Sequence, residues 1–191
     1  MKTSAKTIAA AAFSLATGLS QAASFDFSGS LAFDNSVAKI AFNVDATVSA
    51  VTLWTDSFGD GSNFDPVIQL WAMSGPTSGS LLGENDDFSG VAIAGQTSAD
   101  STLSFAALVP GSYLLTIVAN PNFALSTSYA DGFSLGAAAP GALVGAPGYS
   151  AHLSASGDGI TVSAVPEPAS WALMLLGAAG VLLAAGKRRA A

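Results

Sequence analysis

Short alternating runs of apolar and polar residues fill the middle of the chain. Phe25 and Phe27 alternate with Asp26 and Ser28, and this period of two is typical of a half-buried β-strand. In residues 113–118 one set of apolar side chains points one way and a second set points the other way. The apolar positions of the remaining runs are Leu31, Val48, Val51, Leu53, Trp54, Val67, Ile68, Leu70, Trp71, Leu103, Phe105, Leu108, Ile160 and Val162.

The spacing of these runs predicts an all-β fold. Gly, Pro, Asn, Asp and Ser separate the runs, and none of them has the period and caps of an amphipathic helix. About eight strands in roughly 140 residues favour an antiparallel β-sandwich, jelly-roll-like in type. Residues 135–149, rich in Gly, Pro and Ala, are expected to form a long surface loop.

The N-terminus has the order of a secretory signal peptide. Lys2 and Lys6 precede an apolar run over residues 7–19, which is too short to span a membrane, and small residues follow it. We therefore expect residues 1–22 to be a signal peptide that signal peptidase removes after Ala22, with Ala23 as the alternative position. A buried N-terminal helix is the other interpretation of this segment.

The C-terminus has the features of a single membrane span. Residues 169–186 carry no charge, and as a helix they would measure about 27 Å, enough for a bilayer core. The basic cluster that follows is expected to stop the span on the cytoplasmic side; it consists of Lys187, Arg188 and Arg189.

A stiff peptide precedes this span. Pro166 and Pro168 hold Glu167 in an extended backbone that a helix cannot include. This motif, the span and the basic cluster together resemble the PEP-CTERM sorting signal, over residues 165–191. The resemblance implies a Gram-negative bacterium and an exosortase, a membrane transpeptidase that cuts near the motif. It also implies an inner-membrane precursor that is passed to the cell surface or extracellular matrix, usually in species that make exopolysaccharide.

Part of the ectodomain, residues 23–164, resembles a second family. The similar passages are residues 64–71, 81–87, 108–115, 122–123 and 131–133. They are similar to the pre-peptidase C-terminal type of β-sandwich found in secreted bacterial proteins. That resemblance implies a non-catalytic accessory or surface domain.

Composition and charge exclude several classes of protein. The chain has no cysteine, so disulfides and thiolate zinc sites are impossible. Between residues 24 and 165 a single base, Lys39, stands against twelve acids, a net charge of −11. Such a surface repels nucleic acid, and we expect no nucleic-acid partner.

The sequence predicts no enzyme. Residues 132–136 fit the G-x-S-x-G pattern around Ser134, but that mechanism needs a following helix, then an acid and then a histidine. Here His152 precedes Asp158, the last acid of the ectodomain, so the order is reversed. His152 is expected to be an ordinary strand or loop residue. Glu84 and the aspartates could supply the carboxyl pair of a glycosidase, but nothing in the sequence places them across a cleft.

Two acidic loops, over residues 56–65 and 84–87, suggest a calcium site. The proposed ligands are Asp60, Asn63, Asp65, Asp86 and Asp87. Calcium binds six to eight oxygens of such side chains, of backbone carbonyls and of water. The alternative is that Asp and Asn are ordinary turn formers on a solvated acidic surface.

Two function classes remain open. The first is a non-enzymatic surface or extracellular-matrix protein that contacts exopolysaccharide or other envelope components. The second is a specific ligand binder, such as an adhesin, a carbohydrate-binding protein or an ice-binding protein. The ectodomain contains no Thr-x-Thr ladder, which disfavours ice binding.

Overall fold

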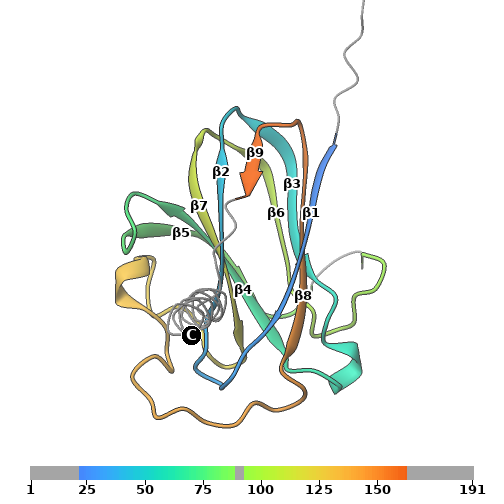
Figure 1. The fold of residues 1–191 in the computed structure, drawn as a ribbon, viewed down its shortest axis with the longest axis vertical. Coiled ribbons are helices and arrows are strands. Elements are labelled where there is room, and N and C mark those ends of the chain that lie inside the picture. The colour runs from blue at the N-terminus through green and yellow to red at the C-terminus, as the bar shows by residue number, and fades with distance from the viewer. Residues whose placement is uncertain (1–21, 89–92, 163–191) are drawn as a thin grey trace, which may run out of the picture.

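The computed structural model describes residues 22–88 and 93–162, which form two antiparallel β-sheets (Figure 1). The four-stranded sheet contains, in spatial order, β1 (Ala22–Ser30), β8 (Gly148–Ser156), β3 (Val48–Thr55) and β6 (Thr102–Leu108). The five-stranded sheet contains β5 (Gly79–Asn85), β4 (Pro66–Met73), β7 (Gly111–Ala119), β2 (Ala38–Val44) and β9 (Ile160–Val162). Two short 3₁₀ turns complete the described elements, η1 (Gly59–Gly61) and η2 (Tyr129–Asp131).

The strand pairing is nested in the manner of a jelly roll. β1 pairs with β8, β2 with β7, β3 with β6 and β4 with β5, so strands distant in sequence become neighbours. β9 extends the five-stranded sheet by pairing with residues 42–44 of β2. The predicted antiparallel, jelly-roll-like β-sandwich is therefore confirmed.

The main core lies between the two sheets. Alternate residues of nearly every strand point into it, which explains the period of two in the sequence. The ring of Tyr113 stacks on Phe42 with a centroid distance of 5.5 Å. Its hydroxyl donates a hydrogen bond to the carbonyl of Val109 at 2.8 Å, so the one polar atom of this buried ring has a partner.

A second, smaller apolar cluster covers the outer face of the five-stranded sheet. Trp71 is fully buried there, with Tyr129 and Phe133 edge-on at centroid distances of 5.2 and 6.2 Å. Trp71 Nε1 donates to Thr116 Oγ1 at 2.9 Å. The segment over residues 120–136 supplies the rings that cover this face, which is why β4 and β7 are apolar on both faces.

Two sequence-based boundaries differ from the structure. Glu84 and Asn85 end strand β5, although the sequence analysis placed them in an acidic loop. The predicted loop over residues 135–149 ends two residues early, because Gly148 and Tyr149 pair with β1 as the start of β8. Both boundaries depend on cross-strand pairing with distant residues, which local composition does not encode.

The predicted signal peptide and sorting signal fall almost entirely outside the described residues. Ala22 is the first residue of β1, and residues 1–21 and 163–191 are not described. Within residues 22–88 and 93–162, no helix has the length and apolar character needed to cross a membrane. The predicted span over residues 169–186 lies outside the described residues, and it stays a prediction.

Candidate functional site

Three carboxylates meet at one end of the β4–β5 pair. Asp65 directly precedes β4, and Asp86 and Asp87 directly follow β5. Because the two strands are antiparallel neighbours, the start of one lies beside the end of the other. One oxygen from each of the three carboxylates lies within 4.8 Å of the other two.

Asn120 joins two of these carboxylates. Its side-chain amide donates to Asp65 Oδ2 and to Asp86 Oδ2, both at 3.0 Å. Its backbone N–H donates to the carbonyl of Asp65 at 2.9 Å. The other carboxylate oxygens, Oδ1 of Asp65 and Oδ1 of Asp86, are buried and have no hydrogen-bond partner. Two buried acceptors therefore remain without a donor.

The pKa values of two carboxyl groups in this cluster, Asp65 and Asp86, are raised. Burial, followed by the charges of Asp65, Asp87 and Glu84, raises the pKa of Asp86 to about 6. Burial also raises the pKa of Asp65; the hydrogen bond from Asn120 opposes this, while nearby carboxylates reinforce it. No cation among the described residues offsets this concentration of charge.

The side chain of Ser101 holds the loop after β5 in place. Its hydroxyl lies 2.6 Å from the carbonyl of Pro66, 2.8 Å from that of Asn85 and 2.7 Å from that of Asp86. The side chain of Asn85 accepts a hydrogen bond from the backbone of Thr102 at 2.8 Å. The residues at the start of β6 therefore position Asp86, and with it the carboxylate cluster.

The structure divides the predicted calcium ligands. Asp65, Asp86 and Asp87 come together, whereas Asn63 donates its amide to the carbonyl of Ser57 at 2.6 Å, in the loop after β3. The side chain of Asp60 lies outside the described part of the chain. The sequence analysis missed Asn120, because it lies far along the chain at the end of β7.

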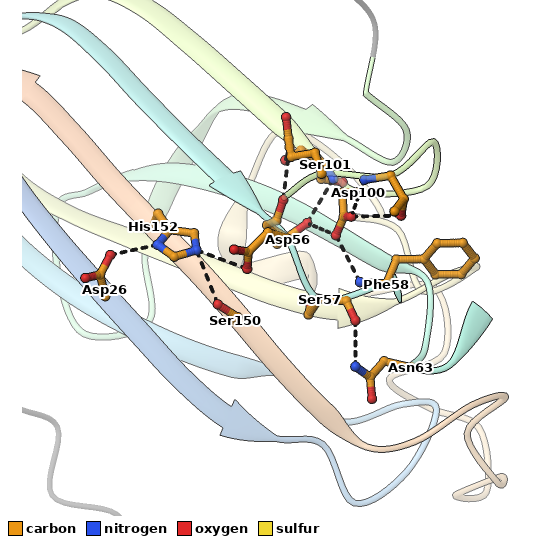
Figure 2. Close-up of polar contacts among 12 residues, drawn as sticks. Asp26, Asp56, Ser57, Phe58, Asn63, Asp100, Ser101, Ser150 and His152 are labelled. Atoms are coloured by element: carbon orange, nitrogen blue, oxygen red, sulfur yellow. Dashed lines mark hydrogen bonds and ion pairs between the residues drawn. The ribbon is translucent and has the colours of Figure 1, made fainter. Parts of the chain in front are cut away.

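A second polar cluster surrounds His152 on the outer face of the four-stranded sheet (Figure 2). His152 Nδ1 lies 2.7 Å from Asp26 Oδ1, and Nε2 lies 3.0 Å from Asp56 Oδ1. The Trp54 ring stacks on the imidazole at a centroid distance of 4.8 Å. The strand register explains the arrangement, because His152 pairs with Asp26 on one side and with Trp54 on the other.

The contacts of this histidine favour the imidazolium. Burial alone lowers the pKa of His152, but the hydrogen bonds and charges of Asp26 and Asp56 outweigh burial and raise it. Burial likewise tends to raise the pKa of Asp56, yet hydrogen bonds from Ser150 and His152 lower it overall. A residue expected to be an ordinary strand or loop histidine thus joins β1, β8 and the end of β3.

Ser150, His152 and Asp26 have the connectivity of a catalytic triad. Ser150 Oγ lies 3.2 Å from Nε2, and Asp26 is on the opposite ring nitrogen. A general base must present an unprotonated Nε2 to the serine. Here the carboxylate of Asp56 also lies against Nε2 and stabilises a proton on it. The arrangement therefore fits a structural ion pair better than a nucleophile and its base.

The other residues considered for catalysis have structural contacts. Ser134 of the G-x-S-x-G pattern is exposed and donates its hydroxyl to the carbonyl of Pro121 at 2.9 Å. Glu84 Oε2 accepts from Gln69 Nε2 at 3.1 Å and from the backbone of Ala124 at 2.8 Å. Glu84 thereby fastens the covering segment over residues 120–136 to the sheet.

Asp100 is a fully buried carboxylate that the sequence analysis did not single out. It accepts from the hydroxyl of Thr55 and the backbone of Phe58, both at 3.1 Å. It also accepts from the backbone of Thr97 at 2.8 Å. These bonds organise the loops beside the His152 cluster, and they give Asp100 a structural role.

Comparison with protein families identifies the C-terminal segment. Residues 164–189 match the PEP-CTERM protein-sorting motif, directly after the last strand of the sandwich. The motif implies an exported, exosortase-processed protein of a Gram-negative bacterium. A search of curated proteins gives no match for this chain. The resemblance of the ectodomain to the pre-peptidase C-terminal type stays a prediction, although the fold is a β-sandwich as that resemblance implies.

Proposed function

We propose that the protein is a non-enzymatic component of the cell surface or extracellular matrix, associated with exopolysaccharide or other envelope material. The observation that carries this proposal is the sorting motif over residues 164–189, which follows a folded β-sandwich. The polar clusters of the sandwich support a non-enzymatic role, because their contacts join strands and loops to one another. In this proposal signal peptidase and exosortase are the processing partners.

The short connection between the sandwich and the motif bears on the sorting step. β9 ends at Val162, and only residues 163–165 separate it from Pro166. Three residues span at most about 10 Å. A cut near Pro166 therefore occurs close to the folded domain. Until exosortase releases it, the domain is held beside the outer side of the inner membrane.

Substitution of the motif tests this proposal. Changing Pro166, Glu167 and Pro168 to Ala leaves the hydrophobic span intact, so the precursor should still insert but stay uncut in the inner membrane. Fractionation of the native host and immunoblotting measure this. Pro140→Ala, in an exposed loop, is the matched control and should reach the surface. Surface delivery of the triple variant at the parent level would contradict the proposal.

We also infer that the cluster of Asp65, Asp86 and Asp87 binds calcium, which would stabilise the exported domain. Calcium–oxygen distances are about 2.3–2.6 Å, so oxygens on opposite sides of one ion lie about 5 Å apart. The three carboxylate oxygens, within 4.8 Å of one another, fit that spacing. The buried Oδ1 atoms of Asp65 and Asp86, which have no hydrogen-bond partner, are suitable ligands.

A melting experiment separates a calcium site from ordinary turn formation. Millimolar calcium should raise the melting temperature of the full chain at pH 7.5, because a ligand of the native state stabilises it. Asp65→Asn and Asp86→Asn should remove that gain, whereas Asp158→Asn, in the exposed turn before β9, should keep it. An equal melting temperature with and without calcium would leave turn formation as the full explanation.

A further inference from the structure

A cavity of about 530 Å³ lies on the outer face of the five-stranded sheet, a size typical of small-ligand sites. Its walls come from β2, from β7, from the turn that follows β4 and from η2. The covering segment over residues 120–136 buries Trp71 beside it, and Tyr129 of that segment forms one side of the cavity. The cavity thus occupies a part of the sheet face that this segment leaves open.

Lys39 is an unusual residue at this site. It is the only base between residues 24 and 165, where twelve acids stand, yet it forms no ion pair with any described residue. Its Nζ lies 5.7 Å from the centroid of the Tyr129 ring. No acidic residue lines the cavity. The only Lys or Arg between residues 24 and 165 therefore lies at a ligand-sized hollow that no acidic residue lines.

The remaining lining combines free donors with an apolar floor. Asn43 Oδ1 accepts a hydrogen bond from the hydroxyl of Ser112 at 2.8 Å, and this bond orients the side-chain amide. The N–H groups of that amide have no partner among the described residues. Ala41, Met73 and Leu114 supply apolar surface between these polar groups. A ligand that fits has an anionic group, hydroxyl acceptors and an apolar face.

We propose that this cavity binds a uronate sugar unit of an otherwise neutral polysaccharide. The Lys39 ammonium pairs with the uronate carboxylate, and the Asn43 amide donates to a ring or hydroxyl oxygen. The apolar floor contacts the C–H face of the sugar ring. This inference rests on the proposed association with exopolysaccharide, and it names the ligand class and the site.

The charge of the whole domain restricts the ligand further. A net charge of −11 between residues 24 and 165 repels a chain that carries a carboxylate on every sugar. Screening reduces that repulsion beyond about 8 Å at physiological salt, so a single carboxylate at Lys39 is tolerated. We therefore expect isolated uronates between neutral sugars to bind better than polyuronates.

A matched pair of disaccharides tests the site. Cellobiouronic acid and cellobiose differ only in one carboxylate, and both can be titrated calorimetrically into the full chain in a polyoxyethylene detergent that carries no sugar. Cellobiouronate should bind at least about tenfold more tightly, the difference expected for one charged hydrogen bond. Lys39→Met and Asn43→Asp should each remove this preference, and Lys39→Arg should retain it.

Control variants and ligands keep the result specific. Ser104→Asp, exposed on β6 of the other sheet, makes the same charge change as Lys39→Met and should bind like the parent. Equal affinity for both disaccharides, no binding of either, or an unaffected Lys39→Met variant would overturn the proposal. Binding of an acidic peptide as tightly as cellobiouronate would also overturn it. None of these outcomes depends on the sorting motif, so the proposed export and processing stand or fall separately.

Discussion

His152 contacts two carboxylates and an aromatic ring on the outer face of the four-stranded sheet. Its ring lies between Asp26, whose side chain is 80% exposed, and Asp56, whose side chain is 27% exposed (Figure 2). The ring of Trp54 stacks on it. An exposed ion pair contributes little, because water screens it and the side chain must be ordered. The pair with Asp56 should therefore contribute more than the pair with Asp26.

The raised pKa of His152 sets a direction for the pH dependence of stability. The folded state holds this proton more tightly than the unfolded chain, whose histidine titrates near 6.5. The contribution is complete below that pH and is lost as pH rises through the higher folded pKa. His152→Gln should lower the free energy of unfolding at pH 6 by about 1 kcal/mol and flatten its decline above pH 6.5.

Chemical denaturation between pH 5.5 and 8.5 measures this effect. Asp56→Asn should reproduce most of the loss, and Asp26→Asn a smaller part of it. Two results together would show that the imidazolium does not stabilise the fold. They are a free energy of unfolding that rises across this pH range in the parent protein, and the same pH dependence in His152→Gln.

Asp86 affects the stability of the fold in a lower pH range than His152 does. Its pKa of about 6 in the folded state exceeds the usual 3.8, so folding favours its protonated form. Without calcium, stability should therefore fall as pH rises from about 4 to about 6, because the unfolded chain releases this proton first. Asp86→Asn should reduce that slope, leaving the part that Asp65 contributes, and should raise the melting temperature at pH 7 in the presence of a chelator.

Calcium gives this prediction an internal control. A bound divalent cation favours the ionised carboxylates, so saturating calcium should reverse the slope for the parent but not for Asp86→Asn. Thermal melts at pH 4, 5, 6 and 7, with chelator and with calcium, measure both effects. A calcium-free parent that becomes more stable between pH 4 and 6 would contradict the raised pKa.

At the residue scale, the sequence predicted the carboxylate cluster in part. Asp65 and Asp86 are close because each flanks a strand, and strand ends can be read from the pattern of apolar residues. Asn120 and the partners of His152 could not be predicted, because they depend on which strands pair and in which register. No local signal places Asp26 opposite a residue so far along the chain.

At the scale of elements, the loop over residues 134–147 makes a close backbone approach to the segment before β4 at Gly145. Gly145 has a φ of +93°, and a Cβ there would lie 2.5 Å from the backbone carbonyl of Asn63. Ala146 next to it donates to the carbonyl of Ser62 at 2.9 Å and accepts from the backbone of Phe64 at 3.1 Å. The loop is thereby attached to the segment that leads into β4.

Gly145→Ala should destabilise the domain for two reasons, the left-handed backbone and the steric overlap with Asn63. The expected loss is roughly 2–3 kcal/mol. Gly61→Ala is the matched control, because Gly61 also has a positive φ of +90° and its Cβ position meets only the Phe58 ring, at an ordinary contact distance of 3.9 Å. It should cost only about 1–2 kcal/mol. Equal losses in the two variants, measured by denaturant unfolding, would contradict the role of the close contact.

The positions of strands were easier to predict from the sequence than the segment that covers the outer face of the five-stranded sheet. The period of two found strand β1, because burial of one face leaves a regular trace in the sequence. It did not predict the cover over residues 120–136, whose rings meet Trp71 through an irregular backbone. Gln69 and Thr116, buried polar residues on that face, bond to each other at 2.6 Å, and no pattern of apolar residues predicts such a pair.

At the scale of the whole molecule, the chain divides according to charge. The sandwich is acidic, and nearly all the bases lie in the two terminal segments. Ala22, beside the predicted signal-peptidase site, bridges to Gly157 in the turn before β9. The start of the sandwich thus lies beside the turn that leads into its last strand and then into the sorting motif.

The central claim is that the protein is exported and cut near Pro166-Glu167-Pro168. Mass spectrometry of the mature protein, recovered from the surface or medium of the native host, tests it most directly. The account predicts an N-terminus at Ala23 or Ser24, a C-terminal peptide that ends near Glu167, and no peptide from residues 169–186. Recovery of that hydrophobic segment on mature surface protein would show that the tail is retained as an anchor, and it would contradict the account.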